Sequence, residues 1–208
     1  MEWFDLPLFP LHTVLFPRQT LVLHVFERRY RTMIEWCLMQ RVPFGVTLIQ
    51  SGDEVGDEAV PHRVGTTAWI QEVTQFADGR MSVKVIGRQR FRVLYSAYDG
   101  PCLTARVQPL YDVEEPFREI EALVARVRAQ FHHYNAARRP QNQTSWHIPR
   151  DPARLTWLVA GTLELDIMER QRLLASGRAS ERLLILSSWL EQALHQTSRS
   201  EPGGGRCG

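Results

Sequence analysis

The stretch that most constrains this chain runs from Leu6 to Tyr30, LPLFPLHTVLFPRQTLVLHVFERRY. Its first apolar run, Leu6 to Leu11, contains two prolines, which cannot donate a backbone hydrogen bond to a strand ladder. The prolines therefore predict strand starts, edges or crossings instead of the interior of a central strand. The later segment, Thr20 to Phe26, is rich in leucine and valine on both faces, which predicts a strand buried on both sides.

A helix is predicted directly after this strand, beginning at Glu27. Apolar residues then recur at the helical spacing on one face: Phe26, Tyr30, Met33, Ile34, Cys37 and Leu38. We expect strand, turn and helix to form one core, onto which later strands pair.

Short strands dominate the rest of the first half of the chain. They are predicted at residues 43–50, 64–76, 81–86, 91–98 and 103–110. Asp78 and Gly79 are typical of a tight hairpin turn, and Gly87 indicates a break or a bulge. Strands of this length and spacing, with one early helix, predict a small barrel or rolled sheet.

The second half is predicted to be helical. Apolar residues follow the helical period after Pro116, Asp151 and Asp166 suit N-caps, and the last helix is expected over 180–195. The tail is rich in serine and glycine. The predicted organisation is an α+β chain with a β-rich subdomain at 1–112, a helical subdomain at 113–197 and a disordered tail at 198–208.

The composition bounds the class of protein. The chain has 208 residues, is 44% hydrophobic and 23% charged, and carries a net charge of +2. Because the charge is not gathered in one basic region, a nucleic-acid partner is not expected. No apolar run approaches the ~18 residues of a membrane helix, and the N-terminus lacks a basic leader, so we expect a cytoplasmic protein without a membrane partner.

The sequence shows no catalytic constellation. It lacks the patterns GxxxxGK[ST], GxGxxG and GxSxG. Lys84, the single lysine, is expected in mid-strand beside valines, and the three cysteines do not have the spacing of a zinc site. We therefore predict a protein that is not an enzyme and holds no cofactor and no metal.

Two sets of residues are candidates for binding. Exposed aromatic and methionine side chains are typical anchors for polypeptide, and four residues lack an obvious core role: Trp36, Met39, Trp69 and Trp146. Packing inside the protein is the alternative for Trp36 and Trp69. Arg88, Arg90 and Arg92 alternate along a strand and could follow a phosphate backbone, or they could form a solvated face with carboxylate partners.

Nine short motifs occur in a recognisable order along the chain. They are LPLFPL (6–11), LFP (15–17), VFERRY (25–30), FGV (44–46), GDEVG (52–56), VGTTAWI (64–70), DGR (78–80), GRQRFRV (87–93) and LELDIMERQRLLASGRASERL (163–183). Together they resemble the N-terminal substrate-binding domain of Lon proteases.

The resemblance implies a fold and a function. In that family a PUA-like domain of the β-barrel type, with one early helix, precedes an α-helical bundle. The implied function is non-catalytic recognition of unfolded or degron-bearing polypeptide, here as a stand-alone domain without the ATPase and Ser–Lys protease modules. A partner protease or chaperone system and homo-oligomerisation stay open. The alternatives are a PUA-like RNA-binding protein using the arginine face, or a purely structural or oligomerisation module.

Overall fold

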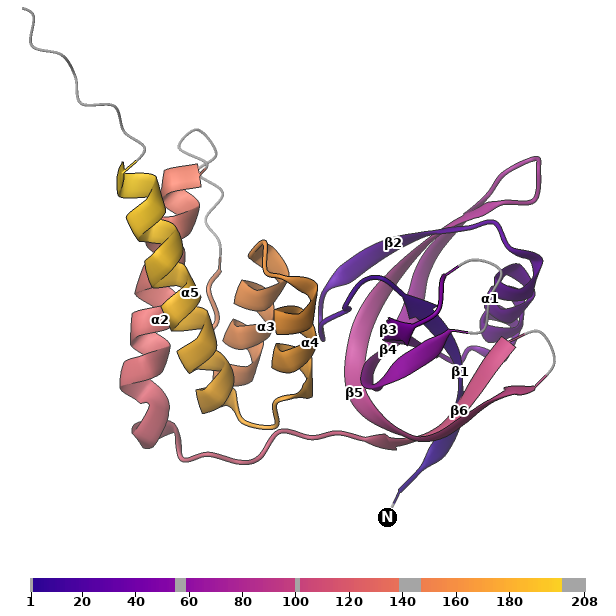
Figure 1. The fold of residues 1–208 in the computed structure, drawn as a ribbon, viewed down its shortest axis with the longest axis horizontal. Helices are drawn as coiled ribbons and strands as arrows, with labels where there is room; N and C mark the ends of the chain where they lie inside the picture. The colour runs from indigo at the N-terminus through magenta and orange to yellow at the C-terminus, as the bar shows by residue number, and fades with distance from the viewer. Residues whose placement is uncertain (1, 55–58, 100–101, 139–146, 200–208) are drawn as a thin grey trace, which may run out of the picture. The chain divides into compact units, whose positions relative to one another are not determined.

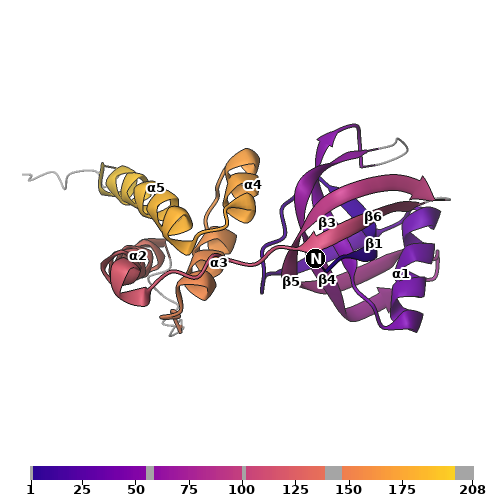
Figure 2. The same cartoon turned by 90° about the horizontal axis from the view of Figure 1, so that it is seen from below.

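The structure, a computed structural model, describes residues 2–54, 59–99, 102–138 and 147–199. Its internal contacts divide the chain into two compact units (Figures 1 and 2). The first comprises Met1–Tyr111 with Leu163–Gly177, and the second comprises Asp112–Thr162 with Arg178–Gly208. The segment Leu163–Gly177 therefore belongs with the sheet, although it lies within the range 113–197 predicted for a helical subdomain. Whether residues 1–112 and 113–197 fold as separate subdomains stays a prediction.

The first unit is built on one mixed sheet. Its strands are β1 (Phe4–Leu11), β2 (Thr20–Val25), β3 (Phe44–Ser51), β4 (Val60–Gln75), β5 (Met81–Asp99) and β6 (Cys102–Pro109). Their order is β2-β5-β4-β3-β1-β6, and the long strand β5 also pairs with β6. The sheet therefore curls until its pairing returns to β5, as Figure 1 shows. The predicted α+β class is confirmed, and the two strands expected at 81–86 and 91–98 are one.

The prolines of β1 lie where the strand changes its partner. Residues Phe4 to Leu8 pair antiparallel with β6, and Leu8 to Leu11 pair parallel with β3. Pro7 and Pro10 thus each lie in a half of the strand that is paired on one side, where a missing N–H need not break a ladder. The expectation that these prolines mark a crossing agrees with this register.

Strand β2 does not have the environment that its composition predicts. Among the described residues it pairs with β5 and with no other strand, so it is an edge of the sheet (Figure 1). Leu23 and Val25 are buried, whereas Val22 and His24 are exposed. The prediction of a strand buried on both sides is wrong, because only the inward face of β2 has other side chains to pack against.

Helix α1 (Arg28–Gln40) closes the main core of the first unit. Glu27 precedes its first turn, as predicted. Tyr30, Met33, Ile34 and Cys37 are buried together with side chains of β1, β3 and β5, and the ring of Tyr30 stacks on that of Phe9 at 4.0 Å between centroids. Phe26 and Leu38, which the helical period places on the same face, are exposed instead.

A bulge in β5 interrupts the alternation of its side chains. Thr66 pairs with Arg90, and Ala68 pairs with Gly87, so one residue of β4, Thr67, opposes two of β5, Arg88 and Gln89. The predicted bulge is therefore present after Gly87. It separates Arg88 from Arg90, which a regular strand would have placed on the same face.

Helix α4 (Ile167–Ala175) is held to the sheet by polar side chains. Asp166 caps it by accepting a hydrogen bond from the backbone N–H of Met168 at 2.8 Å. Gln171 Nε2 donates to the carbonyl of Val64 at 3.0 Å, and a guanidinium nitrogen of Arg170 donates to that of Val14 at 3.2 Å. These contacts explain why the chain returns to the first unit after residue 162.

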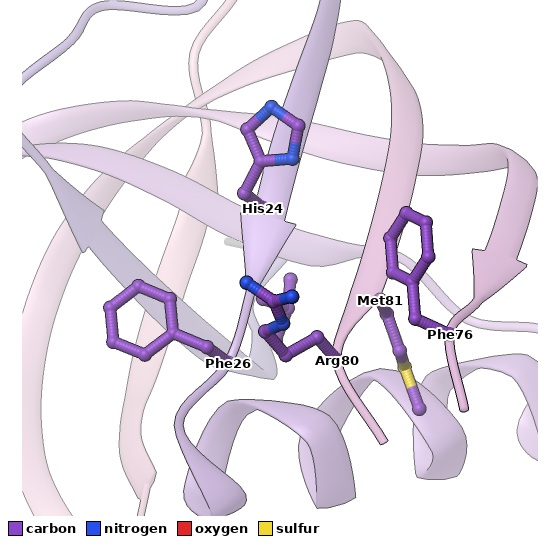
Figure 3. Close-up of a pocket in the computed structure, with 6 residues that line it drawn as sticks. His24, Phe26, Phe76, Arg80 and Met81 are labelled. Atoms are coloured by element: carbon purple, nitrogen blue, oxygen red, sulfur yellow. The ribbon is translucent and has the colours of Figure 1, made fainter. Parts of the chain in front are cut away.

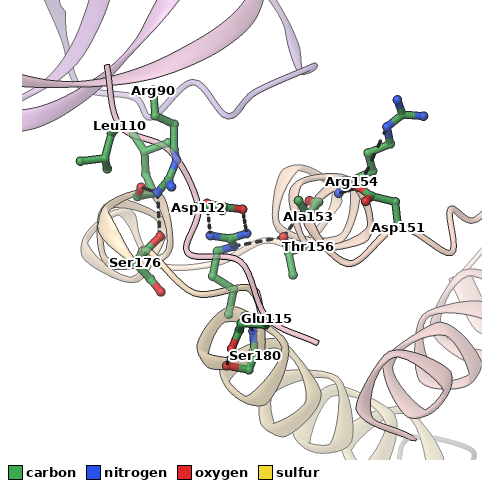
Figure 4. Close-up of polar contacts among 12 residues, drawn as sticks. Arg90, Leu110, Asp112, Glu115, Asp151, Ala153, Arg154, Thr156, Ser176 and Ser180 are labelled. Carbon is green, nitrogen blue, oxygen red and sulfur yellow. Dashed lines mark hydrogen bonds and ion pairs between the residues drawn. The ribbon is translucent and has the colours of Figure 1, made fainter. Parts of the chain in front are cut away.

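The second unit consists of α2 (Phe117–Arg138), α3 (Pro152–Thr162) and α5 (Ala179–Arg199). Fully buried Arg182 makes paired hydrogen bonds to Asp112 at 2.9 and 2.5 Å and donates to Thr156 Oγ1 at 3.1 Å (Figure 4). Its guanidinium carbon also lies 4.1 Å from the ring centroid of Trp157. Helix α5 continues to Arg199, past the predicted start of the tail, and residues 200–208 lie outside the described residues.

Glu115 accepts hydrogen bonds from the backbone and hydroxyl of Ser180 at the start of α5 (Figure 4). No described helix is both long and apolar enough to cross a membrane.

Candidate functional site

Exposed apolar side chains gather where β2 ends. A cavity of about 490 Å³ lies there, lined by His24, Val25 and Phe26 after β2 and by Phe76, Arg80 and Met81 at the β4–β5 hairpin. Figure 3 shows Phe26 and Phe76 on its two sides, with Arg80 between them. Phe26 is 52% exposed and Phe76 is 47% exposed, so both rings are available to a partner.

A second cavity continues from the first along β2. It measures about 340 Å³ and shares His24, Val25 and Phe26 with the first. Its other walls come from β1 with Phe9 and Leu11, from the segment Leu21 to Glu27, and from Tyr30 and Glu54. We call the two cavities together the β2 groove. Its lining is apolar along most of its length.

Few charges face the β2 groove. Glu27 is paired with Arg29 at 3.1 Å, and the Glu54 carboxylate accepts a hydrogen bond from the backbone N–H of His12. At the other end, Arg80 is paired with Asp78 at 2.7 Å. The backbone N–H and the guanidinium of Arg80 lower the pKa of the Asp78 carboxyl. The groove therefore offers carboxylates at the Glu54 end and a guanidinium at the hairpin end.

The buried groups beneath the groove are kept neutral by their surroundings. Burial raises the pKa of Tyr30 to about 12 and that of Cys37 to about 12, so neither ionises at neutral pH. Among the described residues, no group of three His, Cys, Asp or Glu side chains is placed to hold a metal ion. The chemistry that this site offers is apolar contact and backbone hydrogen bonding.

The structure places the predicted polypeptide-binding residues on two different surfaces. Trp36 and Met39 lie on α1 and are 46% and 73% exposed, but neither lines the β2 groove. Trp69 is half-buried on β4, where the Arg88 guanidinium lies 4.9 Å from its ring centroid. Trp146 lies outside the described residues. Of the described members of this set, Trp36 and Met39 lie on α1 and Trp69 on β4, and their role in binding stays a prediction.

The predicted arginine face needs a correction at Arg90. This side chain is only 3% exposed, and its guanidinium donates to the carbonyls of Leu174 and Ser176, at 2.6 Å each (Figure 4). Its positive charge therefore lies at the C-terminal end of α4, where cations are favourable. Arg88 and Arg92 are exposed, but Arg90 is not available to a phosphate backbone.

Sequence reasoning missed the residues that form the β2 groove. The helical period of α1 predicts Phe26 as a core residue, and the strand pattern predicts Phe76 at the end of a strand. A signal was present, since Phe76 lies two residues before the Asp78–Gly79 turn, where an aromatic side chain has little sheet to pack against. The position of β2 at an edge had no signal, because it depends on pairing between distant segments.

Comparisons with known proteins agree with this architecture. Residues 5–192 match the family model described as the ATP-dependent protease La (LON) substrate-binding domain. The chain is 31% identical to Lon protease 2 of Herpetosiphon aurantiacus over 196 residues, which cover 91% of this chain and 24% of that protein. It is 28% identical to the Lon protease of Escherichia coli K12 over 199 residues, which cover 93% of this chain and 25% of that protein. The chain thus spans about a quarter of the length of these relatives.

Solved structures show the same fold. The Lon N-terminal domain protein from Xanthomonas campestris superposes with a TM-score of 0.68 at 29% identity, over 89% of this chain and 98% of that one. The N-terminal domain of the Mycobacterium avium complex Lon protease superposes with a TM-score of 0.70 at 20% identity, over 90% and 98%. With the match over residues 5–192, the chain belongs to the family of Lon substrate-binding domains.

Proposed function

We propose that this domain binds unfolded or degron-bearing polypeptide, without catalysing a reaction on it, and that the β2 groove is its binding site. The family supports the class of ligand, since its members are described as substrate-binding domains of a protease. The observation that carries the choice of site is the pair of half-exposed rings, Phe26 and Phe76, facing one apolar cavity.

The chemistry of the groove suits such a ligand. An unfolded chain differs from a folded one by its exposed apolar side chains and its unpaired backbone groups. Val22, Phe26 and Phe76 are each about half-exposed, which leaves apolar surface in water that a partner would cover. Apolar lining with few charges selects for unfolded polypeptide as a class, with little dependence on one exact sequence.

The wider setting is also a proposal. The chain matches a quarter of the length of proteases from several bacteria, and we propose that it delivers or presents polypeptide to a protease or chaperone system in the cytoplasm. The exposed face of α1, with Trp36 and Met39, is a second surface that a long client could contact.

The test measures the affinity for a fluorescently labelled, permanently unfolded model protein by fluorescence anisotropy. We expect the wild type to bind and Phe76→Ser to bind roughly thirtyfold more weakly, as is typical when an anchor at an interface is truncated. Leu184→Ser, which removes an exposed leucine from α5, is the matched control and should bind like the wild type.

Salt dependence separates this function from the RNA-binding alternative. Capture through apolar contacts should change little with added salt, whereas binding to a phosphate backbone weakens steeply. If the wild type does not bind the unfolded protein but binds a single-stranded RNA in a salt-sensitive way, the proposed function is wrong.

A further inference from the structure

One side of β2 is a free edge of the sheet, where its backbone N–H and C=O groups do not pair with another strand of the described chain. Within the described part of the chain, residues Thr20 to Val25 pair with Ile86 to Met81 of β5, and no second strand lies in register on the other side. An edge of this kind is a template for one more strand. Proteins that do not use such an edge commonly protect it with a charge, a proline or a covering loop, and β2 itself contains neither a charged residue nor a proline.

The register indicates which backbone groups are available. Gly87 donates its N–H to the carbonyl of Gln19 at 2.9 Å, which marks Gln19 as a residue bonded to β5. Since bonding alternates along an antiparallel pair, Leu21, Leu23 and Val25 also bond to β5. Thr20, Val22 and His24 therefore direct their N–H and C=O groups toward the free edge.

The β2 groove lies along this free edge. Its lining includes Leu21 to Glu27 on one side and Phe9 and Leu11 of β1 on the other. A strand placed there would bond to Thr20, Val22 and His24 and would set alternate side chains against the apolar lining. The carboxylates of Glu27 and Glu54 lie at one end of this part of the groove. Glu27 is paired with Arg29 at 3.1 Å, so Glu54 is the carboxylate that can attract a basic residue of a ligand.

We propose that the β2 groove takes its ligand by strand addition: an extended apolar segment, flanked by a basic residue, pairs with the free edge of β2. This inference rests on the proposed function and specifies the form of the polypeptide. Backbone bonding gives affinity without reading a sequence, and the apolar lining selects segments that a folded protein would bury. At the Glu54 end the carboxylate of Glu54 makes lysine or arginine the favourable flanking residue, and an acidic residue is unfavourable there.

The first test uses backbone N-methylation of a short labelled peptide that alternates valine and threonine and ends in lysine. In an added strand only every second N–H faces β2. Methylating that set should weaken binding at least about tenfold, since two or more hydrogen bonds are lost. Methylating the other set leaves those bonds in place and is the matched control. A version of the peptide with glutamate in place of lysine should also bind more weakly.

The second test follows amide hydrogen exchange in the wild-type protein as the same unmodified peptide is added. Exchange at Thr20, Val22 and His24 should slow in the complex, because these amides become bonded to the peptide. The amides of Leu21, Leu23 and Val25 are already bonded to β5 and serve as the internal reference. Neither test depends on a variant that must fold.

The outcomes separate this inference from the proposed function. If the unmodified peptide binds, and the two methylated sets weaken binding equally while exchange at Thr20, Val22 and His24 does not change, strand addition is wrong and side-chain capture in the groove stands. If neither the peptide nor the unfolded protein binds at all, the proposed function fails and the inference fails with it. Unequal effects of the two sets, together with slowed exchange, support strand addition.

Discussion

Replacing Arg90 with methionine should loosen α4 from the sheet. The buried guanidinium donates to the carbonyls of Leu174 and Ser176 at 2.6 Å each, and methionine keeps the apolar stem but supplies no donor. Hydrogen bonds from charged groups contribute about 1.5–3 kcal/mol each, and removing the donor from a buried carbonyl adds to the cost. Part of this is recovered by apolar packing, so we expect α4 to lose about 3–5 kcal/mol of local stability.

Hydrogen exchange measured by mass spectrometry reads this change directly. A loss of about 3 kcal/mol corresponds to roughly hundredfold faster exchange in peptides that cover Ile167–Ala175, if exchange occurs through local opening. Exchange in α2 and α5 should stay as in the wild type. Arg92→Met is the matched control on the same strand, because Arg92 is exposed and its replacement should change stability by no more than about 0.5 kcal/mol.

The result also decides between two roles for Arg90. If Arg90→Met leaves α4 as protected as the wild type and instead lowers affinity for RNA, our reading of Arg90 as the residue that anchors α4 is refuted. If α4 exchanges faster and Arg92→Met does not produce this effect, Arg90 belongs to the fold.

Three further predictions concern other parts of the chain. Gly65→Ala should strongly lower the melting temperature of the first unit, measured by calorimetry, because the added methyl group would lie 2.5 Å from the carbonyl oxygen of Val46. An unchanged melting temperature would mean that the backbone shifts to make room for the methyl group. Burial raises the pKa of the Glu115 carboxyl, but hydrogen bonds led by those from Ser180 outweigh burial, so the pKa is lowered in the folded protein. The stability that this carboxylate contributes should therefore be fully present above pH 4.5 and be lost as the pH falls through the lowered pKa. Glu115→Gln should flatten that part of the curve of unfolding free energy against pH. Trp36→Ala should keep the circular dichroism melting curve almost unchanged, since the side chain is half-exposed, and a loss of many degrees would make Trp36 a core residue. Its effect on client affinity tests whether α1 contributes to binding.

Local patterns were enough to predict much of the fold. The period of the apolar residues located α1 and its buried face, the Asp78–Gly79 pair located a hairpin, and Asp166 was recognised as the cap of α4. These features depend on residues that are near one another in the sequence. Each is therefore visible before any strand is paired.

Features that depend on distant pairing could not be predicted. The sequence from Thr20 to Phe26 predicts a buried strand, but β2 is an edge of the sheet, and its residues line the β2 groove together with residues of β1. Arg90 looked like a surface residue because the bulge after Gly87 and the contact with α4 are both tertiary. The residues whose environment the sequence does not predict are thus the ones that matter most here. Exposed Phe26 and Phe76 line the proposed site, and buried Arg90 holds α4 to the sheet.

Site-specific photo-crosslinking tests the central claim most directly, because it reports which surface touches the client. A photoreactive phenylalanine analogue in place of Phe76 would face the β2 groove, and the same analogue in place of Leu184 would lie on an exposed part of α5. After irradiation with labelled unfolded protein, we predict a crosslinked product from the Phe76 position, competed away by unlabelled client, and none from the Leu184 position. Equal crosslinking at both positions, or crosslinking at the Leu184 position alone, would contradict recognition of polypeptide in the β2 groove.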